Sequence, residues 1–210
     1  MKILSVSDEV EEAIYNESLK DQFSDIDLVL ACGDLPPHYL EFIVTKLSAP
    51  LLYILGNHDQ GSHSADGHFR IEPRGCINVD EQIVKLQGLL IGGLEGSMRY
   101  SYQGGPQYSE QDMRLKAIRM IPNLWWNRFR YGRAIDILIT HAAPFGIHDG
   151  TDPCHTGFRT FLHIMRIYRP RYLIHGHMHV YNNDTITQTT YYDTQVVNTY
   201  GYRVISWNSD

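Results

Sequence analysis

The chain has 210 residues, a formal net charge of −6 and a sequence pI of about 6.0. This acidic balance, without a run of Lys or Arg, argues against a nucleic-acid-binding protein. No apolar stretch reaches the length of a membrane span, and the N-terminus lacks the apolar region of a signal peptide. Three scattered cysteines are typical of free thiols in a reducing compartment, so we expect a cytoplasmic protein with one domain over residues 1–210.

Short apolar runs alternate with amphipathic segments in the first 57 residues. The runs 2–7, 27–34 and 50–57 are almost continuously apolar, which indicates buried strands. The segments between them, 11–23 and 38–47, carry apolar residues at helical spacing. Alternating strands and helices predict parallel strands joined by right-handed crossovers.

The rest of the chain predicts further strands and helices around a loose stretch at 60–80. In chain order we expect a hairpin around Gln87-Gly88 (81–96), a helix that opens with a capping box (109–121), a strand (134–144), a helix (157–170), a strand (171–179) and a β-rich tail. Two sheets packed face to face, with helices outside, use all of these elements.

Polar residues with metal-binding side chains follow five of the apolar runs. Ligands of parallel α/β sheets collect outside the carboxyl ends of the strands. Each residue alone is explained as well by a turn or an exposed strand, but the repeated pattern favours a shared site for one or two divalent ions. These residues are Asp8, Asp34, Asn57, His58, Asp59, His141, His177 and His179.

The motifs GD (33–34), GNHD (56–59), TH (140–141) and GHMH (176–179), in this order, resemble the calcineurin-like metallophosphoesterases, in their small single-domain branch. The resemblance runs from Asp8 to His179. It implies an α/β fold, a four-layer αββα sandwich of two mixed β-sheets flanked by helices, which agrees with the predicted elements. It also implies a metal-dependent enzyme that hydrolyses a phosphomonoester or phosphodiester of a small molecule.

The resemblance assigns roles to these residues. It implies that Asp8, Asp34 and His179 bind a first ion, and that Asp34, Asn57, His141 and His177 bind a second. His58 is then expected to protonate the leaving oxygen or to stabilise the phosphoryl oxygens, and Asp59 to orient His58. Two ions about 3.5–4 Å apart activate a bridging hydroxide that attacks phosphorus in line. The mixed N/O ligands suit Mn²⁺, Fe or Zn²⁺.

The first motif departs from the family pattern Asp-x-His, because Val10 stands where the family has a histidine. Three explanations are open: Glu9 fills the position, water fills it and weakens the first ion, or the first ion is lost. We favour water. The alternative function is therefore a weakened or inactive phosphoesterase fold that binds a protein partner.

Residues outside the motifs give weaker signals. Arg99, in a Gly- and Tyr-rich loop, is a candidate phosphate contact because a guanidinium group suits phosphate. His155, in the loop 141–158, is a second candidate, although a loop packed by its own hydrogen bonds explains it equally well. Trp125 and Trp126 are interpreted as a helix end that covers a sheet.

Overall fold

The computed structural model describes the chain except residues 60, 64–68, 71, 102–104, 183 and 209–210. Its first large sheet has the spatial order β15 (Gly201–Ser206), β1 (Lys2–Ser7), β2 (Leu28–Ala31), β3 (Leu51–Tyr53) and β6 (Ile77–Asn78). Its strands β1, β2, β3 and β6 are parallel, as the alternating pattern predicts, and β15 joins β1 antiparallel.

The second large sheet is built mainly from the C-terminal half of the chain. Its order is β13 (Gln188–Tyr191), β14 (Thr194–Asn198), β12 (Tyr172–His175), β11 (Ile137–Thr140), β8 (Leu89–Leu94) and β7 (Ile83–Leu86). The four inner strands are parallel and the two edge strands are antiparallel. Short pairs are formed by β4 (Ser62–His63) with β5 (Phe69–Arg70), and by β9 (Ser97–Met98) with β10 (Gln107–Tyr108).

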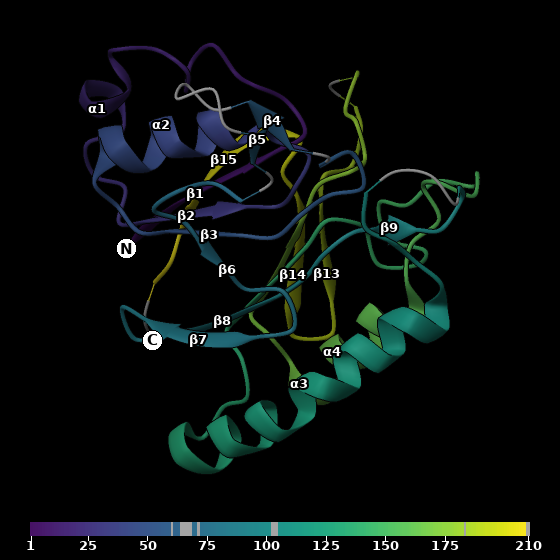
Figure 1. Cartoon of the computed structure of the whole chain (residues 1–210). Helices are drawn as coiled ribbons and strands as arrows, with labels where there is room; N and C mark the ends of the chain where they lie inside the picture. Colours follow the sequence, from purple (N-terminus) through teal and green to yellow (C-terminus); the bar gives the residue numbers. More distant parts are fainter. Residues whose placement is uncertain (60, 64–68, 71, 102–104, 183, 209–210) are drawn as a thin grey trace.

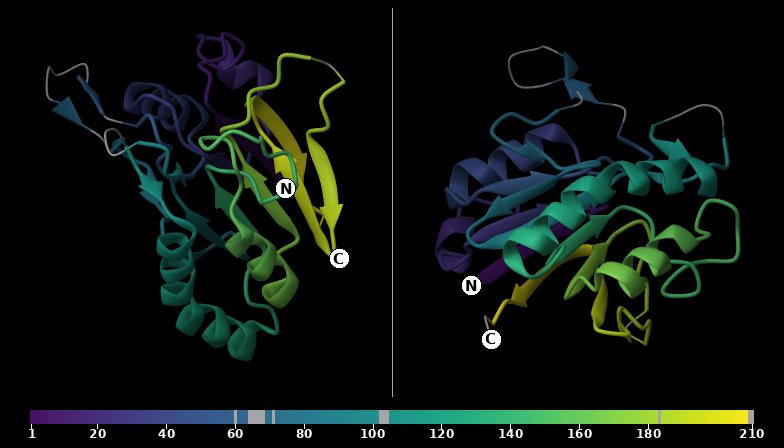
Figure 2. Two further views of the ribbon diagram at one scale, coloured as in Figure 1. Left: turned by 90° about the vertical axis from the view of Figure 1, so that its right-hand side faces the viewer. Right: turned by 90° about the horizontal axis from the view of Figure 1, so that it is seen from below.

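Helices cover the outer faces of both sheets (Figures 1 and 2). On the first sheet lie α1 (Leu19–Gln22) and α2 (Pro37–Leu47), and on the second lie α3 (Glu110–Tyr131) and α4 (Arg159–Tyr168). The predicted αββα layering is therefore confirmed.

The strands are buried on both faces, which explains their nearly continuous apolar sequences. In β2, Val29 and Ala31 pack with α2, whereas Leu28 and Leu30 pack against the second sheet. Successive strand residues point to opposite faces, so one strand contributes to two separate apolar layers.

Local signals set several element boundaries. Gln87 and Gly88 both have positive φ, 49° and 87°, as a two-residue hairpin turn requires. The Ser109 side chain accepts a hydrogen bond from the Asp112 backbone, and the Asp112 carboxylate accepts one from Ser109 N–H, which completes the predicted capping box.

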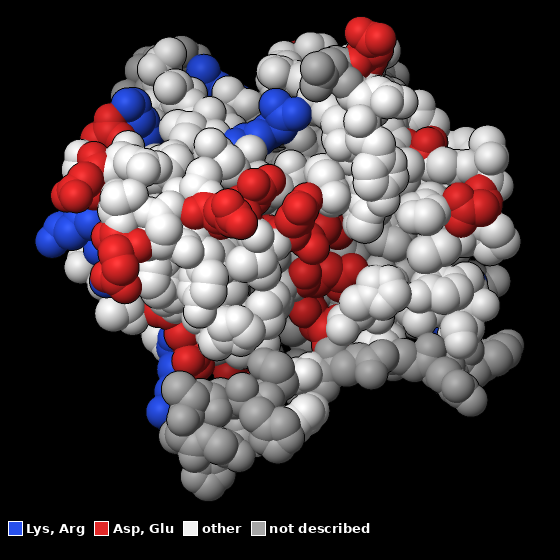
Figure 3. Space-filling view, turned by 90° about the horizontal axis from the view of Figure 1, so that it is seen from above, with Lys and Arg blue, Asp and Glu red and all other residues white. Residues whose placement is uncertain are grey.

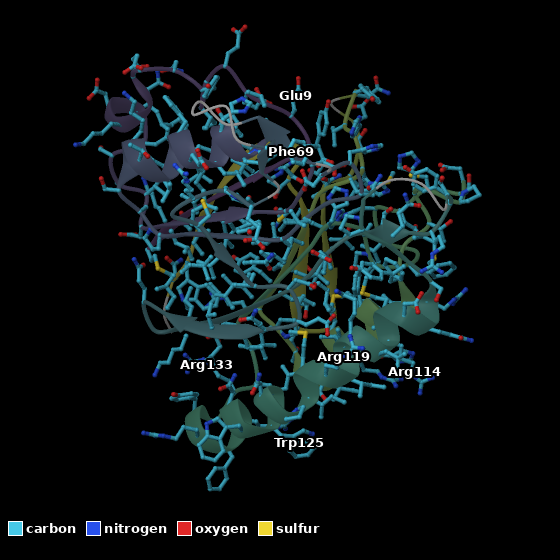
Figure 4. All side chains as sticks on the ribbon, in the orientation of Figure 1. Glu9, Phe69, Arg114, Arg119, Trp125 and Arg133 are labelled. Atoms are coloured by element: carbon cyan, nitrogen blue, oxygen red, sulfur yellow. The ribbon has the colours of Figure 1, made fainter. Side chains whose placement is uncertain are left out.

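Two expectations about helices were wrong. Of the predicted helix at 11–23, only α1 forms, because Asn16 bonds locally to Ser18 N–H and to the Glu12 carbonyl and so competes with helical hydrogen bonds. Trp125 and Trp126 do not cover the sheet, since they are 64% and 63% exposed. Figure 4 places Trp125 on the side of α3 that faces away from the sheets. None of the helices in the described ranges is long and apolar enough to cross a membrane.

Candidate metal centre

The two sheets bring three predicted ligands together. Asp34 follows β2 of the first sheet, whereas His141 and His177 follow β11 and β12 of the second. One ligand atom from each of these residues lies within 4.8 Å of the other two. Segments separated by more than 100 residues therefore converge where strand ends of the two sheets meet, and each ligand stands after a strand, as the strand-end pattern predicts.

Unusual backbone conformations aim these side chains out of the strand ends. Asp8, Asp34 and His177 have positive φ values of 66°, 56° and 66°, which are uncommon for residues other than glycine. A Cβ at Gly56 would overlap the Asp34 carboxylate, and one at Gly176 would overlap the Ser7 hydroxyl. Both motif glycines are thus required because a Cβ would clash there, and three of the predicted ligands have strained backbones.

His141 is fully buried and fixed by the backbone. Its Nδ1 donates to the Cys32 carbonyl at 2.8 Å, so its Nε2 faces Asn57 Oδ1 at 2.9 Å and Asp34 Oδ2 at 3.3 Å. A histidine tied through one nitrogen to a carbonyl is typical of metal ligands, because the tie fixes the tautomer and the ring orientation. The atoms around His141 Nε2 are therefore arranged as a set of ligands.

Asp34 and His141 also form an electrostatic pair. Burial favours a lower pKa for His141, but the Asp34 carboxylate raises that pKa to about 9. Burial conversely favours a higher pKa for Asp34, but the charge and hydrogen bond of His141 lower it to about 2. The position thus already accommodates one positive charge, which a cation can replace.

Hydrogen bonds fix both the backbone and the ring of His177. Its backbone N–H donates to both Asp8 carboxylate oxygens, at 3.0 and 2.9 Å, and its ring Nε2 donates to the Cys154 carbonyl at 2.9 Å. This bond engages Nε2 and leaves Nδ1 for an ion. Burial, followed by repulsion from His141, lowers the pKa of His177 to about 3, so its ring is neutral, as metal binding requires.

Asn57 completes this side of the centre. It is 1% exposed, and while its Oδ1 faces His141, its Nδ2 donates to the Tyr100 hydroxyl at 3.3 Å. That bond assigns the carbonyl oxygen of the amide to the ligand position.

The side of the centre formed by Asp8 and His179 is open. His179 is exposed, its Nδ1 pairs with the Tyr181 hydroxyl at 2.8 Å, and its ring stacks on Tyr200. Neither of the two ligand groups among the described residues includes it. The structure therefore does not bring His179 to the ligands that converge around His141.

The position of the missing histidine is open as well. Val10 is 39% exposed. Burial, followed by a hydrogen bond to Glu9, raises the pKa of Tyr200 to about 12. The Glu9 carboxylate is thus engaged by Tyr200, which does not favour the explanation in which Glu9 replaces the missing ligand.

His58 and Asp59 occupy the turn after β3. The His58 side chain is exposed, and its backbone N–H donates to Asp34 Oδ1 at 2.8 Å. Asp59 Oδ2 accepts from Gly56 N–H at 2.7 Å and from Asp34 N–H at 2.9 Å. Burial raises the pKa of Asp59 to about 6. Asp59 therefore ties the two motif turns together through their backbones, rather than bonding the His58 ring as we expected.

The two candidate phosphate contacts differ in position. Arg99 pairs with Asp112 at 3.0 Å, at the start of α3. The His155 ring instead lies beside that of His177, with 5.0 Å between the ring centroids. The structure thus brings His155, but not Arg99, into contact with a predicted ligand.

Sequence reasoning missed Tyr100 and Cys154. Tyr100 bonds Asn57, and Cys154 Sγ lies 3.7 Å from His177 Nε2. Proximity to His155 in the chain was the available signal for Cys154, whereas no local pattern points to Tyr100. The face shown in Figure 3 carries a central band of acidic side chains, a setting that attracts cations.

A family profile for calcineurin-like phosphoesterases matches residues 1–181. The chain belongs to the calcineurin-like phosphoesterase family. Calcineurin-like phosphoesterases typically bind divalent metal ions and hydrolyse phosphoesters, and the converging carboxylate, amide and imidazole groups fit such ions. The donor set therefore agrees with the family.

Solved structures agree in fold with this member of the family. One crystal structure matches 97% of this chain and 94% of its own, with 14% identity and a TM-score of 0.65. TT1561 of Thermus thermophilus matches 95% of this chain and 89% of its own, with 15% identity and a TM-score of 0.60. No curated protein sequence matches the chain.

Proposed function

We propose that the protein is a metal-dependent hydrolase of small phosphoesters, with phosphodiesters as the preferred substrates. The observation that carries this proposal is the convergence of Asp34, Asn57 and His141 around one point, with the exposed His58 on the same turn as Asn57. A buried ligand set beside an exposed proton donor is suited to reaction with a dissolved substrate.

The residues have two proposed roles: some bind the divalent ions, and His58 transfers a proton. Asp34, Asn57, His141 and His177 would hold the ions; the Asp34 carboxylate would supply negative charge and two oxygens, and the amide and the imidazoles would add ligands without further negative charge. Divalent ions bound there supply positive charge to a phosphate and make water more acidic. His58 is free to hold or deliver a proton at the leaving oxygen, because only its backbone is bonded to Asp34.

A cavity beside His58 offers space for a leaving group. It has a volume of about 220 Å³ and is lined by Leu35, Pro36 and Pro37, together with Asp34 and His58. Its apolar wall suits an uncharged alcohol better than a second phosphate. We therefore favour esters with a small, partly apolar leaving group.

Hydrolysis of bis(p-nitrophenyl) phosphate and p-nitrophenyl phosphate tests the proposal. After treatment with a chelator, we expect no activity, and we expect Mn²⁺ to restore hydrolysis, with the bis ester favoured. Zn²⁺ and Fe²⁺ are compared in the same assay to identify the best ion. Absence of hydrolysis of both esters with all three ions contradicts the proposal.

A second candidate function is a non-catalytic scaffold that binds a protein partner. The exposed Val10 and the contacts of His179 with Tyr181 and Tyr200 favour it, because they leave one side of the centre open. A scaffold should bind no ion stoichiometrically and should hydrolyse neither ester. Metal analysis of the purified protein therefore separates the two functions.

We also propose a cytoplasmic location and a small-molecule substrate rather than a nucleic acid. Cys32, Cys76 and Cys154 are free thiols, as expected in a reducing compartment. The net charge of −6 disfavours binding to a polyanion.

A further inference from the structure

The loop between β11 and α4 carries a second group of ligands beside the metal centre. Cys154 Sγ, one ring nitrogen of His155 and one of His177 all lie within 4.8 Å of one another. We propose that these three side chains form a binding site for a thiophilic divalent cation such as Zn²⁺. The proposal deepens the proposed function, because His177 also belongs to the group with Asp34 and His141.

The spacing of the ligand atoms fits zinc. Cys154 Sγ lies 3.7 Å from His177 Nε2. Zn–S and Zn–N bonds of about 2.3 and 2.0–2.1 Å at a tetrahedral angle place the two ligand atoms about 3.6 Å apart. The structure therefore holds this pair at about the separation that the ion needs. A site with one thiolate and two imidazoles binds Zn²⁺ and Co²⁺ in preference to Mg²⁺ and Ca²⁺.

Asp152 organises the loop for this purpose. Its Oδ2 pairs with His155 Nδ1 at 2.8 Å, which leaves Nε2 of that ring for an ion. Its Oδ1 accepts the backbone N–H groups of Cys154 and His155, at 3.1 and 3.2 Å. A carboxylate bonded to the far nitrogen of a histidine is a common companion of zinc ligands, since it fixes the ring and increases its basicity.

The main chain of the loop is fixed as well. Gly150 N–H donates to the His155 carbonyl at 2.9 Å, and Thr156 donates through both its N–H and its hydroxyl to the Asp152 carbonyl. A loop tied by these bonds presents Cys154 and His155 with little loss of conformational freedom when an ion binds.

Ion binding exchanges protons in a defined way. Nε2–H of His177 donates to the Cys154 carbonyl at 2.9 Å. Binding forms bonds from the ion to Sγ and to Nε2, and the thiol proton is released to solvent. The ring proton of His177 moves from Nε2 to Nδ1, so the imidazole stays neutral and binds this ion in place of the one beside His141. Cys154 and His155 are partly exposed, so a fourth position stays open for water or for a phosphate oxygen, as in catalytic zinc sites.

Cobalt spectroscopy tests the thiolate ligand directly. We expect Co²⁺ titration of the wild-type protein to produce a thiolate-to-cobalt charge-transfer band in the near ultraviolet. Cys154→Ser should remove the band, whereas the matched control Cys76→Ser should keep it, because Cys76 Sγ contacts the Arg74 carbonyl outside both ligand groups. A band of equal intensity in the Cys154→Ser protein overturns the proposal.

Zinc affinity provides the second measurement. We expect His155→Gln to weaken Zn²⁺ binding at this site by at least about tenfold, and Asp152→Asn to weaken it by about tenfold or more. Far-ultraviolet circular dichroism confirms that each variant is folded. Unchanged Zn²⁺ affinity in folded Cys154→Ser and His155→Gln proteins also overturns the proposal.

Hydrolysis of the bis ester by the wild-type protein with Mn²⁺ is measured in parallel. Hydrolysis without the thiolate band contradicts the zinc site alone, whereas the band without hydrolysis contradicts only the proposed function.

Discussion

The two sides of the metal centre are built in different ways. On one side, His141 and Asn57 are buried, and hydrogen bonds to the Cys32 carbonyl and the Tyr100 hydroxyl fix their orientation. On the other side, Val10 and His179 are exposed, and His179 contacts two tyrosines. The buried side is organised before an ion arrives, and the open side is not.

This difference shows how preorganisation and affinity are linked. A ligand whose second nitrogen is fixed by a carbonyl loses little freedom on binding an ion. His179 must first break its contacts with Tyr181 and Tyr200, which reduces the free energy gained when it binds an ion. We therefore expect one tightly bound ion on the buried side and a weaker one on the open side.

Removal of the shared carboxylate should have the largest effect. Asp34→Asn deletes the charge that faces His141 and that both sides are proposed to share, so we expect loss of both ions and a decrease in hydrolysis of at least about 10³-fold. Metal analysis and the bis ester assay measure this. Asp25→Asn, which removes an exposed partner of Lys2, is the matched control, and full occupancy in the Asp34→Asn protein excludes a bridging role.

Removal of the proton donor should reduce turnover without removing metal. For His58→Ala we expect a decrease in kcat of about 10²–10³-fold, with metal content unchanged because the backbone bond from residue 58 to Asp34 remains. His38→Ala, a change at another histidine, is the control. A His58→Ala protein that has lost its metal shows that this residue is a ligand.

Paired ligand variants should separate the two sides. We expect His141→Asn to weaken the tighter ion by about 100-fold or more, and His179→Asn to change its affinity by less than about threefold. The value for His141→Asn is larger than the roughly 10–100-fold loss of metal affinity that follows removal of a group hydrogen-bonded to a metal ligand, because here the ligand itself is removed. Calorimetric titration with Mn²⁺ measures both affinities. Equal losses of Mn²⁺ affinity in the two variants contradict the proposed difference between the buried and the open side.

A gain of ligand should make the open side resemble the buried side. Val10→His introduces an imidazole at an exposed position next to Glu9, and we expect the weaker ion to bind about tenfold more tightly, roughly 1.4 kcal/mol in binding free energy. Val10→Gln serves as a control of similar size. Unchanged Mn²⁺ affinity means that another group already fills the position.

Acid should destabilise the ion-free protein through its buried neutral histidines. Burial lowers the pKa of His175 to about 3, and the pKa of His177 is also about 3. Between about pH 6.5 and pH 3 these two histidines bind protons in the unfolded chain but not in the folded chain, so their contribution to stability falls as the pH falls. Asp59, whose pKa burial raises to about 6, opposes this loss at one site below about pH 6. The loss is at most about 1.4 kcal/mol per histidine for each pH unit.

Urea unfolding with a chelator at about pH 4–7 measures this dependence. His175→Gln should reduce it, and His38→Gln should not. An identical pH dependence in the wild-type and His175→Gln proteins contradicts this account.

The sequence predicted those features that depend on local backbone pattern. Asp34 and Asn57 follow buried parallel strands of the first sheet, and His141 follows one of the second, so the order along the chain predicts that each lies at a strand end. Their convergence also depends on the packing of the two sheets. The four layers follow in the same way from apolar runs that alternate with helical patterns.

The features that were missed depend on tertiary contacts. Tyr100 and Cys154 reach the centre from long loops, and no periodicity encodes where a loop returns to the site. The bonds of Asp59 to Gly56 and Asp34 depend on how two turns meet, which chain order alone does not specify. The predicted helix at 11–23 failed because the Asn16 side chain bonds the backbone groups of Glu12 and Ser18.

Anomalous diffraction from crystals grown with Mn²⁺ and phosphate tests the central claim most directly. The account predicts the strongest peak about 2.0–2.3 Å from Asp34, Asn57 Oδ1 and His141 Nε2. A strongest peak bound by Asp8 and His179, with none near His141, contradicts it.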